Sequence, residues 1–167
     1  GEEEEALAAY QEAVARDKSS HEAYAAMGAL LMEKDSKTAM QHLARAIALD
    51  PNNSRYYQFK GKLLAQNPGT SKQDILACYN QAVKLDPADV ELRVMLAALL
   101  EEMGNEASAM EHYRAAINLS PVREEAHQGL ARLLMESDPA AALHHINKAI
   151  AQNPKRGDYY YLKSCIY

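Results

Sequence analysis

The sequence lacks several features that mark particular classes of protein. No apolar run reaches the roughly 18 residues that a membrane-spanning helix needs, so we expect no membrane insertion. Its 18 basic residues form no block and are outnumbered by 23 acidic ones, which argues against nucleic acid or an anionic membrane as a partner. The opening residues, GEEEEALAAY, lack an initiator Met and the basic and apolar regions of a signal peptide. We therefore expect a piece of a larger protein.

Cysteines and catalytic motifs are equally scarce. Cys78 and Cys165 lie 87 residues apart and form no C-x-x-C motif, so we expect neither a disulfide framework nor a thiol redox site. Two free thiols favour a reducing compartment such as the cytoplasm, while the location of the whole protein stays open. The sequence contains no nucleophile elbow, glycine-rich phosphate loop, H-E-x-x-H motif or paired loop acids. It predicts a protein that is not an enzyme and that uses no cofactor.

What the sequence does contain is one helix ending, repeated. AIALDPNN (46–53) returns as AVKLDPAD (82–89), AINLSPVR (116–123) and AIAQNPKR (149–156), and the prolines are spaced by 36, 34 and 33 residues. Alanine stands five residues before each proline, and further apolar residues stand three and seven residues before that alanine, on one helix face. The predicted packing residues are Ala39, Leu43 and Ala46; Ile75, Tyr79 and Ala82; Ala109, Tyr113 and Ala116; and Ala142, Ile146 and Ala149.

A second periodic segment precedes each of these helices. These segments are AYAAMGALL (23–31), YYQFKGKLL (56–64), RVMLAALL (93–100) and HQGLARLL (127–134). In the first, Tyr24, Met27, Gly28 and Leu31 have the i, i+3, i+4, i+7 spacing of an amphipathic helix. Helix boundaries are predicted by capping boxes at Ser19-x-x-Glu22 and Ser71-x-x-Asp74, an N-cap at Asp138-Pro139, and a helix stop at Gly104.

Helix pairs with this period resemble the tetratricopeptide repeat (TPR) family. Its pattern is an aromatic, a Leu-Gly pair and a Tyr on a first helix, helix A, then Ala, an aromatic, Ala and Pro on a second, helix B. Residues 90–123 match with Leu96, Leu100, Ala109, Tyr113, Ala116 and Pro121. The sequence departs from the pattern where Arg93 and His127 replace the first aromatic residue, and where alanine replaces glycine at Ala97 and Ala131. The resemblance implies an all-α, right-handed superhelical solenoid of antiparallel helix pairs.

The repeats divide the chain into six parts that we expect to form one continuous solenoid. Residues 1–19 provide helix B alone, four full repeats occupy 20–53, 54–89, 90–123 and 124–156, and residues 157–167 provide helix A alone. One helix pair cannot bury its apolar face by itself, so stacked copies share a core.

The resemblance also implies that helices A line a concave groove. The groove residues predicted on this basis are Ala25, Ala29, Gln58, Lys62, Val94, Ala98, Gln128, Arg132 and Tyr161. This floor is small and mostly apolar, its flanks are mostly acidic, and it suits an amphipathic helix or extended segment of a protein partner. A clamp for a terminal carboxylate, used by chaperone-binding relatives, is disfavoured because alanine and valine occupy the places of its polar donors. Another part of the parent chain, or water alone, remains an alternative occupant.

Two further hypotheses concern the chain ends and the histidines. The end helices, with Tyr10, Tyr159, Tyr160 and Tyr167, could join copies head to tail into homo-oligomers. His42, Cys78, His112 and His145 occupy equivalent places in successive helices B. The axes of packed helices lie ~8–10 Å apart, whereas every ligand atom of a zinc ion lies within ~2.3 Å of the metal. Side chains at equivalent places on successive helices cannot converge this closely, so we expect no metal site. We expect these histidines, and neighbouring His144, to lie on helix surfaces and fill gaps between repeats.

Overall fold

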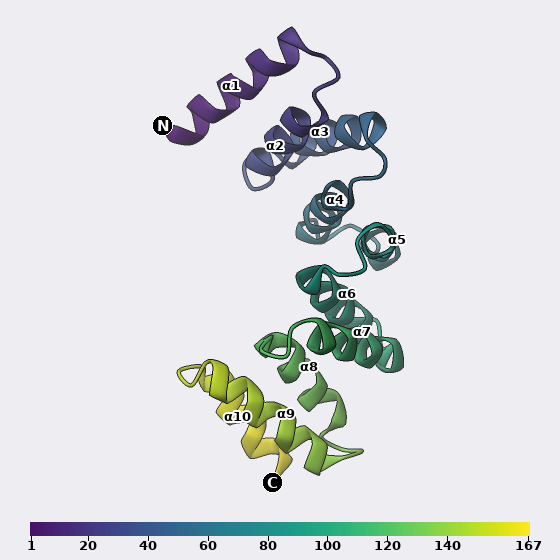
Figure 1. The fold of residues 1–167 in the computed structure, drawn as a ribbon, viewed down its shortest axis with the longest axis vertical. Helices are drawn as coiled ribbons and strands as arrows, with labels where there is room; N and C mark the ends of the chain where they lie inside the picture. The colour runs from purple at the N-terminus through teal and green to yellow at the C-terminus, as the bar shows by residue number, and fades with distance from the viewer. The chain divides into compact units, whose positions relative to one another are not determined.

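The structure, a computed structural model of residues 1–167, is entirely helical (Figure 1). Short turns join consecutive helices, and the strongest packing is within the pairs α2/α3, α4/α5, α6/α7 and α8/α9. The helices are α1 (Glu2–Arg16), α2 (His21–Leu31), α3 (Ser36–Leu49), α4 (Ser54–Gln66), α5 (Lys72–Leu85), α6 (Val90–Glu102), α7 (Glu106–Leu119), α8 (Glu124–Leu134), α9 (Pro139–Gln152) and α10 (Gly157–Ile166).

The chain forms two compact units, Gly1–Asp86 and Pro87–Tyr167. In unit 1, α1 packs on α2, and the pair α2/α3 packs on α4/α5 through α3 with α4 and α2 with α4. In unit 2, the pair α6/α7 packs on α8/α9 through α7 with α8 and α6 with α8, and α10 packs on α9. Each unit therefore has the all-α solenoid packing of helix pairs that the sequence predicts.

The predicted packing residues form the cores of both units. All twelve of the helix B positions named from the repeat are buried, and nine of them have no exposed surface. On helix α2, Met27 and Gly28 are buried while Tyr24 and Leu31 are half-buried at the edge of the same stripe. The periodic pattern thus identified the packed faces correctly.

The repeated helix ending has a repeated hydrogen bond. In α3, α5, α7 and α9, the residue after the helix donates its backbone N–H to the carbonyl of the recurring alanine, at 2.8–3.0 Å. Each capping residue leaves the helical conformation, with φ between −132° and −141°, and this ends the helix. Proline follows because the turn needs no further N–H donor there.

A second repeated hydrogen bond ties each turn to the next helix A. The donors, which we call the proline-carbonyl donors, are Tyr57, Arg93, His127 and Tyr160, and each reaches the carbonyl of the proline six residues earlier, at 2.7–3.1 Å. Arg93 and His127 stand where the family pattern has an aromatic residue. Because they keep the hydrogen bond, these departures preserve the connection between turn and helix.

The predicted helix boundaries hold at Ser71, Asp138 and Gly104 and fail at Ser19, although the Ser71 side chain accepts the N–H of Gln73 and not that of Asp74, as a capping box would require. Ser71 and Asp138 are N-caps whose side chains accept backbone N–H groups, and Pro139 begins α9. Gly104 follows α6 with φ of +76°, its N–H bonds to the Glu101 carbonyl at 2.9 Å, and the next N–H bonds to the Leu100 carbonyl at 2.8 Å. The capping box at Ser19 is wrong, because Asp17 binds the Ser19 hydroxyl and backbone N–H, and α2 begins one residue later, after Ser20.

Two glycines allow a tyrosine ring to lie directly against a helix backbone. A Cβ atom on Gly61 would lie 2.4 Å from the Tyr79 ring, and one on Gly129 would lie 2.3 Å from the Tyr113 ring. Both rings are buried. Gly61 stands at the glycine position of the family pattern, whereas Gly129 lies two residues before Ala131, which occupies that position in its own repeat.

Candidate partner-binding surface

In unit 1 the predicted groove residues lie beside two hollows between helices. Ala25 and Gln58 are buried, while Ala29 and Lys62 are half-buried. A hollow of about 300 Å³ between α2 and α4 is lined by Glu22, Ala25, Ala26, Ala29, Asn53, Arg55, Tyr56 and Phe59. A second, of about 580 Å³, is lined by Glu3, Ala29, Leu30, Met32, Glu33, Lys34, Lys62, Ala65, Gln66 and Tyr79. Ala29 contributes to both hollows, so we name this region the Ala29 surface.

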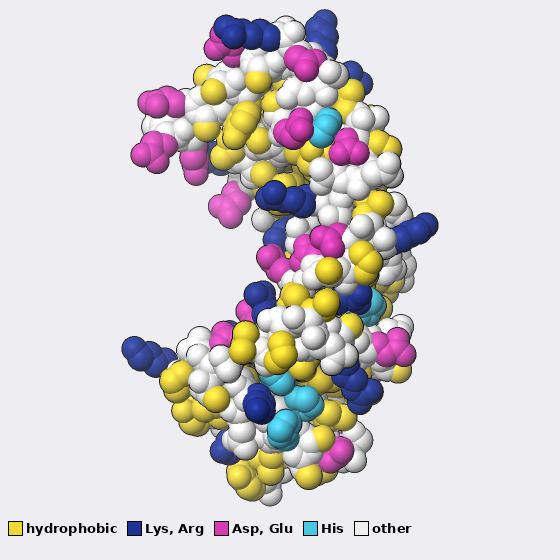
Figure 2. All heavy atoms as spheres, in the orientation of Figure 1, with side chains coloured by type: hydrophobic (Ala, Val, Ile, Leu, Met, Phe, Trp, Pro, Cys, Tyr) yellow, Lys and Arg dark blue, Asp and Glu magenta, His cyan; other side chains and the backbone are white.

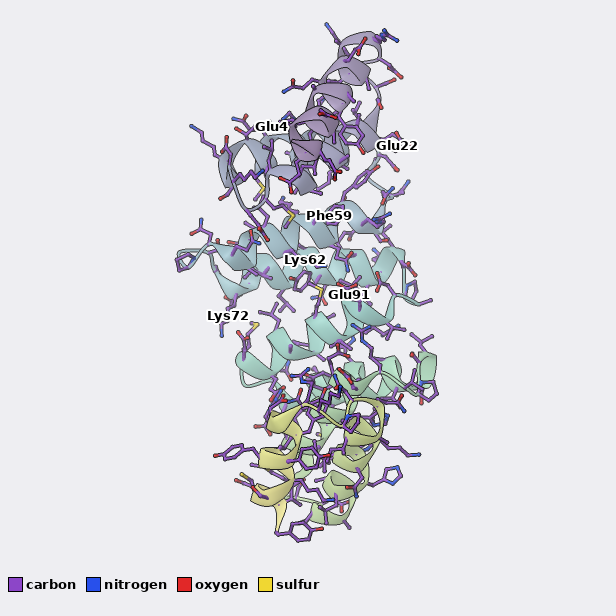
Figure 3. The ribbon with its side chains drawn as sticks, turned by 90° about the vertical axis from the view of Figure 1, so that its left-hand side faces the viewer. Glu4, Glu22, Phe59, Lys62, Lys72 and Glu91 are labelled. Carbon is purple, nitrogen blue, oxygen red and sulfur yellow. The ribbon has the colours of Figure 1, made fainter.

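The Ala29 surface exists because α2 carries small side chains where α4 carries larger ones. Ala25, Ala26 and Ala29 align with Gln58, Phe59 and Lys62 one repeat later. Phe59 forms one wall, and the Arg55 guanidinium lies 5.7 Å from the centre of its ring. Figure 3 shows Phe59 and Lys62 on α4 together with Glu22 of α2. The result is an apolar floor with charged groups at its edge.

Carboxylates dominate the part of this surface contributed by α1 and the start of α2. Glu3 pairs with Lys34, and this hydrogen bond lowers the pKa of the Glu3 carboxyl and raises the pKa of the Lys34 amine. Glu22 is exposed and lies 3.4 Å from the His21 ring. Acidic side chains gather over this end of unit 1 in the space-filling view (Figure 2). A partner bound there would gain from basic residues near its apolar contacts.

In unit 2 the polar members of the predicted groove are paired within the chain. The Gln128 amide donates to Asp158 at 3.0 Å, and Arg132 donates to both carboxylate oxygens of Glu101, with Nη2 at 2.7 Å from Oε2. Tyr113 also donates to Glu101, at 3.1 Å, and burial raises the pKa of its hydroxyl. Val94 and Ala98 are half-buried, and Tyr161 is exposed. This surface offers fewer unengaged polar groups than its sequence suggests.

The four tyrosines predicted for self-association do not form one exposed set. Tyr10, Tyr160 and Tyr167 are exposed, by 36%, 49% and 86%. Tyr159 is fully buried against Ile146 and Ala149, with Arg156 over its ring, and burial raises the pKa of its hydroxyl to about 12. Including Tyr159 in a surface for a second copy was therefore wrong, because its side chain belongs to the core of unit 2.

One pair of histidines was missed from the sequence. His127 is 4% exposed, and its Nδ1 lies 2.9 Å from the Nδ1 of His145 on α9. His145 thus contacts helix A of its own repeat rather than filling a gap between repeats. Tyr24 and His42 occupy the equivalent places in the first full repeat, with ring centres 6.0 Å apart. In both repeats an aromatic or imidazole ring on helix A lies beside the histidine at the equivalent place on helix B. This recurrence was the signal in the sequence.

The remaining candidate chemistry is limited. Cys78 is buried, which raises the pKa of its thiol, while Cys165 is exposed. No three His, Cys, Asp or Glu side chains of the chain converge as a metal site would require. None of the ten helices combines the length and apolar character of a membrane span.

Comparison with known proteins supports the repeat assignment. The tetratricopeptide repeat family model matches residues 78–111. A human protein, general transcription factor 3C polypeptide 3, is 26% identical over 160 residues; the match covers 92% of this chain but only 18% of that protein. These findings confirm the resemblance to the family.

Two solved structures share the fold over nearly the whole chain. YrrB, described as a TPR protein with an unusual peptide-binding site, is 24% identical with a TM-score of 0.78, and the match covers 98% of this chain and 84% of that one. PilF of Pseudomonas aeruginosa is 19% identical with a TM-score of 0.83, and the match covers 99% and 85%. The all-α solenoid of TPR type is therefore confirmed.

Proposed function

We propose that this chain, whose helix pairs have the tetratricopeptide repeat fold, is a non-catalytic scaffold that binds a segment of a protein partner. The observation that carries the proposal is the Ala29 surface, which consists of two adjoining hollows. The smaller one, between α2 and α4, is mainly apolar, and the larger one also has charged walls from Glu3, Lys34 and Lys62. The partner segment is an amphipathic helix or an extended peptide whose apolar side chains enter these hollows. YrrB, which has the same fold, is described as having a peptide-binding site.

The division into repeats belongs to this proposal. Helix B alone at 1–19, full repeats at 20–53, 54–89, 90–123 and 124–156, and helix A alone at 157–167 would make helices A the binding elements of the scaffold. Within unit 1 these are α2 and α4. In unit 2 the internal pairing of Gln128 and Arg132 leaves α6 and α8 fewer polar groups for a partner.

A peptide selection tests the proposal directly. A random peptide library displayed on phage is selected against the intact chain, and the selected clones are then tested on two variants. Ala29→Arg places a long cation in both hollows, and Ala48→Arg places the same side chain on an exposed position of α3. We expect the clones to lose at least tenfold in affinity for Ala29→Arg and to keep their affinity for Ala48→Arg. Equal binding to both variants would remove the Ala29 surface as the site.

Head-to-tail self-association is a second candidate, favoured by the charges of the two ends. Residues 1–17 contain six acidic residues and one basic residue, a net charge of −5, whereas residues 139–167 contain four basic residues and one acidic residue, a net charge of +3. Tyr167 is the most exposed of the tyrosines and suits a test by Tyr167→Asp. Self-association predicts a sedimentation coefficient that rises with concentration, falls with added salt and falls in this variant. A monomer at every concentration would exclude it.

A further inference from the structure

The four proline-carbonyl donors differ in one chemical respect. Tyr57 and Tyr160 use phenol hydroxyls, and Arg93 uses a guanidinium. His127 uses an imidazole, a group that titrates between about pH 5 and pH 8. Among these four equivalent contacts, acidification acts on the one in unit 2 that contains His127.

The hydrogen bonds of His127 fix where its proton lies at neutral pH. Its Nε2 is 3.0 Å from the Pro121 carbonyl oxygen, which only accepts, so Nε2 carries the hydrogen. The Nδ1 of the neutral ring is then an acceptor. Because that Nδ1 lies 2.9 Å from the Nδ1 of His145, the His145 ring donates its Nδ1–H to it. A chain of two hydrogen bonds therefore runs from α9 through His127 to the turn before α8.

Adding protons to this pair has two different effects. One additional proton is tolerated, because His127 can donate from Nδ1 while His145 moves its own hydrogen to Nε2 and accepts. After a second proton is added, both Nδ1 atoms carry hydrogen, and two cationic rings face each other at the same contact. Neither ring can then accept, so the contact must open.

The surroundings of the pair resist this second proton. Arg114 of α7 and Lys148 and His144 of α9 face the two rings and add positive charge. On α6, which also packs on α8, the Glu101 carboxylate is engaged by Arg132. Burial is the largest cause that lowers the pKa of His127, and burial together with these neighbours lowers the pKa of His145 to about 4.

We propose that the His127–His145 contact is an acid-sensitive joint between α8 and α9, closed at neutral pH and opened when both rings are protonated. The joint concerns the stability of unit 2 and does not depend on the proposed binding function. Since α8 also carries Gln128 and Arg132, opening the joint would disturb the surface on which these residues lie. Unit 1 contains no pair of contacting histidines and provides an internal reference.

The sign of the effect follows from the depressed pKa values. A histidine with a pKa of 6.5 in the unfolded chain and about 4 in the folded chain binds protons more readily when unfolded. Its contribution to the free energy of unfolding is therefore complete above pH 6.5. This contribution is lost as the pH falls from 6.5 to about 4, and for one such ring the folding equilibrium constant drops roughly 300-fold. Unit 2 should therefore lose stability as the pH falls through this interval.

The test combines a titration of the intact chain with one variant. NMR follows the Cε1–H signals of the histidine rings, and circular dichroism gives the thermal midpoint at pH 7, 5.5 and 4. His127→Tyr copies the donor used by Tyr57 and Tyr160 and removes the titrating group, while His21→Gln removes a histidine of unit 1 and leaves the His127–His145 contact and its charged neighbours unchanged. We expect His145 to titrate near pH 4, and we expect the thermal midpoints of wild type and His21→Gln to fall further on acidification than that of His127→Tyr.

Two results would overturn the proposal. One is titration of His145 at the ordinary value near 6.5, and the other is an equal acid loss in His127→Tyr and wild type. If His127→Tyr does not fold, two measurements on the wild-type chain decide: the ring titration and amide hydrogen exchange at decreasing pH. That exchange must increase in α8 and α9 before it increases in α2 to α5, and uniform exchange across both units would count against the joint.

Discussion

Replacement of Gly129 by alanine tests the packing of unit 2 most sharply. The added Cβ would lie 2.3, 2.4 and 2.7 Å from three ring carbons of Tyr113, well inside van der Waals contact. The ring has little freedom to retreat, because it is 2% exposed and its hydroxyl donates to Glu101. The methyl group and the ring cannot occupy this space together, so the variant must displace the ring.

Two opposing effects set the change in the free energy of unfolding of Gly129→Ala. Losing the packing of a buried aromatic ring costs about 3–5 kcal/mol, and alanine in a helix interior gains about 1 kcal/mol over glycine. The net destabilisation of Gly129→Ala is therefore about 2–4 kcal/mol. For a unit of this size each kcal/mol lowers the thermal midpoint by roughly 4–8 °C, so the midpoint should fall by at least about 8 °C.

The assay is thermal unfolding followed by circular dichroism, with a second background that removes the ring. In Tyr113→Ala the added methyl meets no aromatic carbon, so Gly129→Ala should there be neutral or stabilising by up to about 1 kcal/mol. Gly157→Ala is the control, since a Cβ atom at that position would have no neighbouring heavy atom within 4 Å. An unchanged midpoint in Gly129→Ala, or an equal loss in both backgrounds, would refute the packing argument.

Three other substitutions test the helix ends and the unit 2 network. Gly104→Ala, at φ of +76°, should lower stability by about 1 kcal/mol, seen as a lower denaturation midpoint. Asp138→Ala removes the N-cap of α9 and should cost about 1 kcal/mol by the same assay, with Asp138→Asn largely retaining stability. Glu101→Gln weakens the bonds from Arg132 and Tyr113 and should cost about 1 kcal/mol, an effect that shrinks in high salt; no salt dependence would contradict the ionic contribution.

The repeat pattern was sufficient to predict the fold because each repeat imposes the same packing. Ala39, Leu43 and Ala46 have no exposed surface, as expected from their spacing on one helix face. The equivalent residues of the other repeats are also buried. Side-chain partners were less predictable. The pairing of Arg132 with Glu101 joins residues 31 positions apart on different repeats, and the consensus pattern says nothing about such exposed or half-exposed positions.

The site was predicted less completely than the fold for a related physical reason. Ala29 was named as a groove residue, but the hollows beside it depend on Phe59, Arg55 and Met32, whose positions follow from three-dimensional packing. Tyr159 was misplaced because a run of three tyrosines on one helix necessarily points in different directions. His127 and His145 lie on different helices, so their contact could be found only by comparing equivalent positions across repeats.

The most direct measurement of the proposed scaffold function is amide hydrogen exchange of the chain with and without a selected peptide bound. We expect new protection concentrated in α2 and α4, around Ala29 and Phe59, with little change in α3 or α10. Protection confined to α3, or to the end of the chain near Tyr167, would contradict binding at the Ala29 surface.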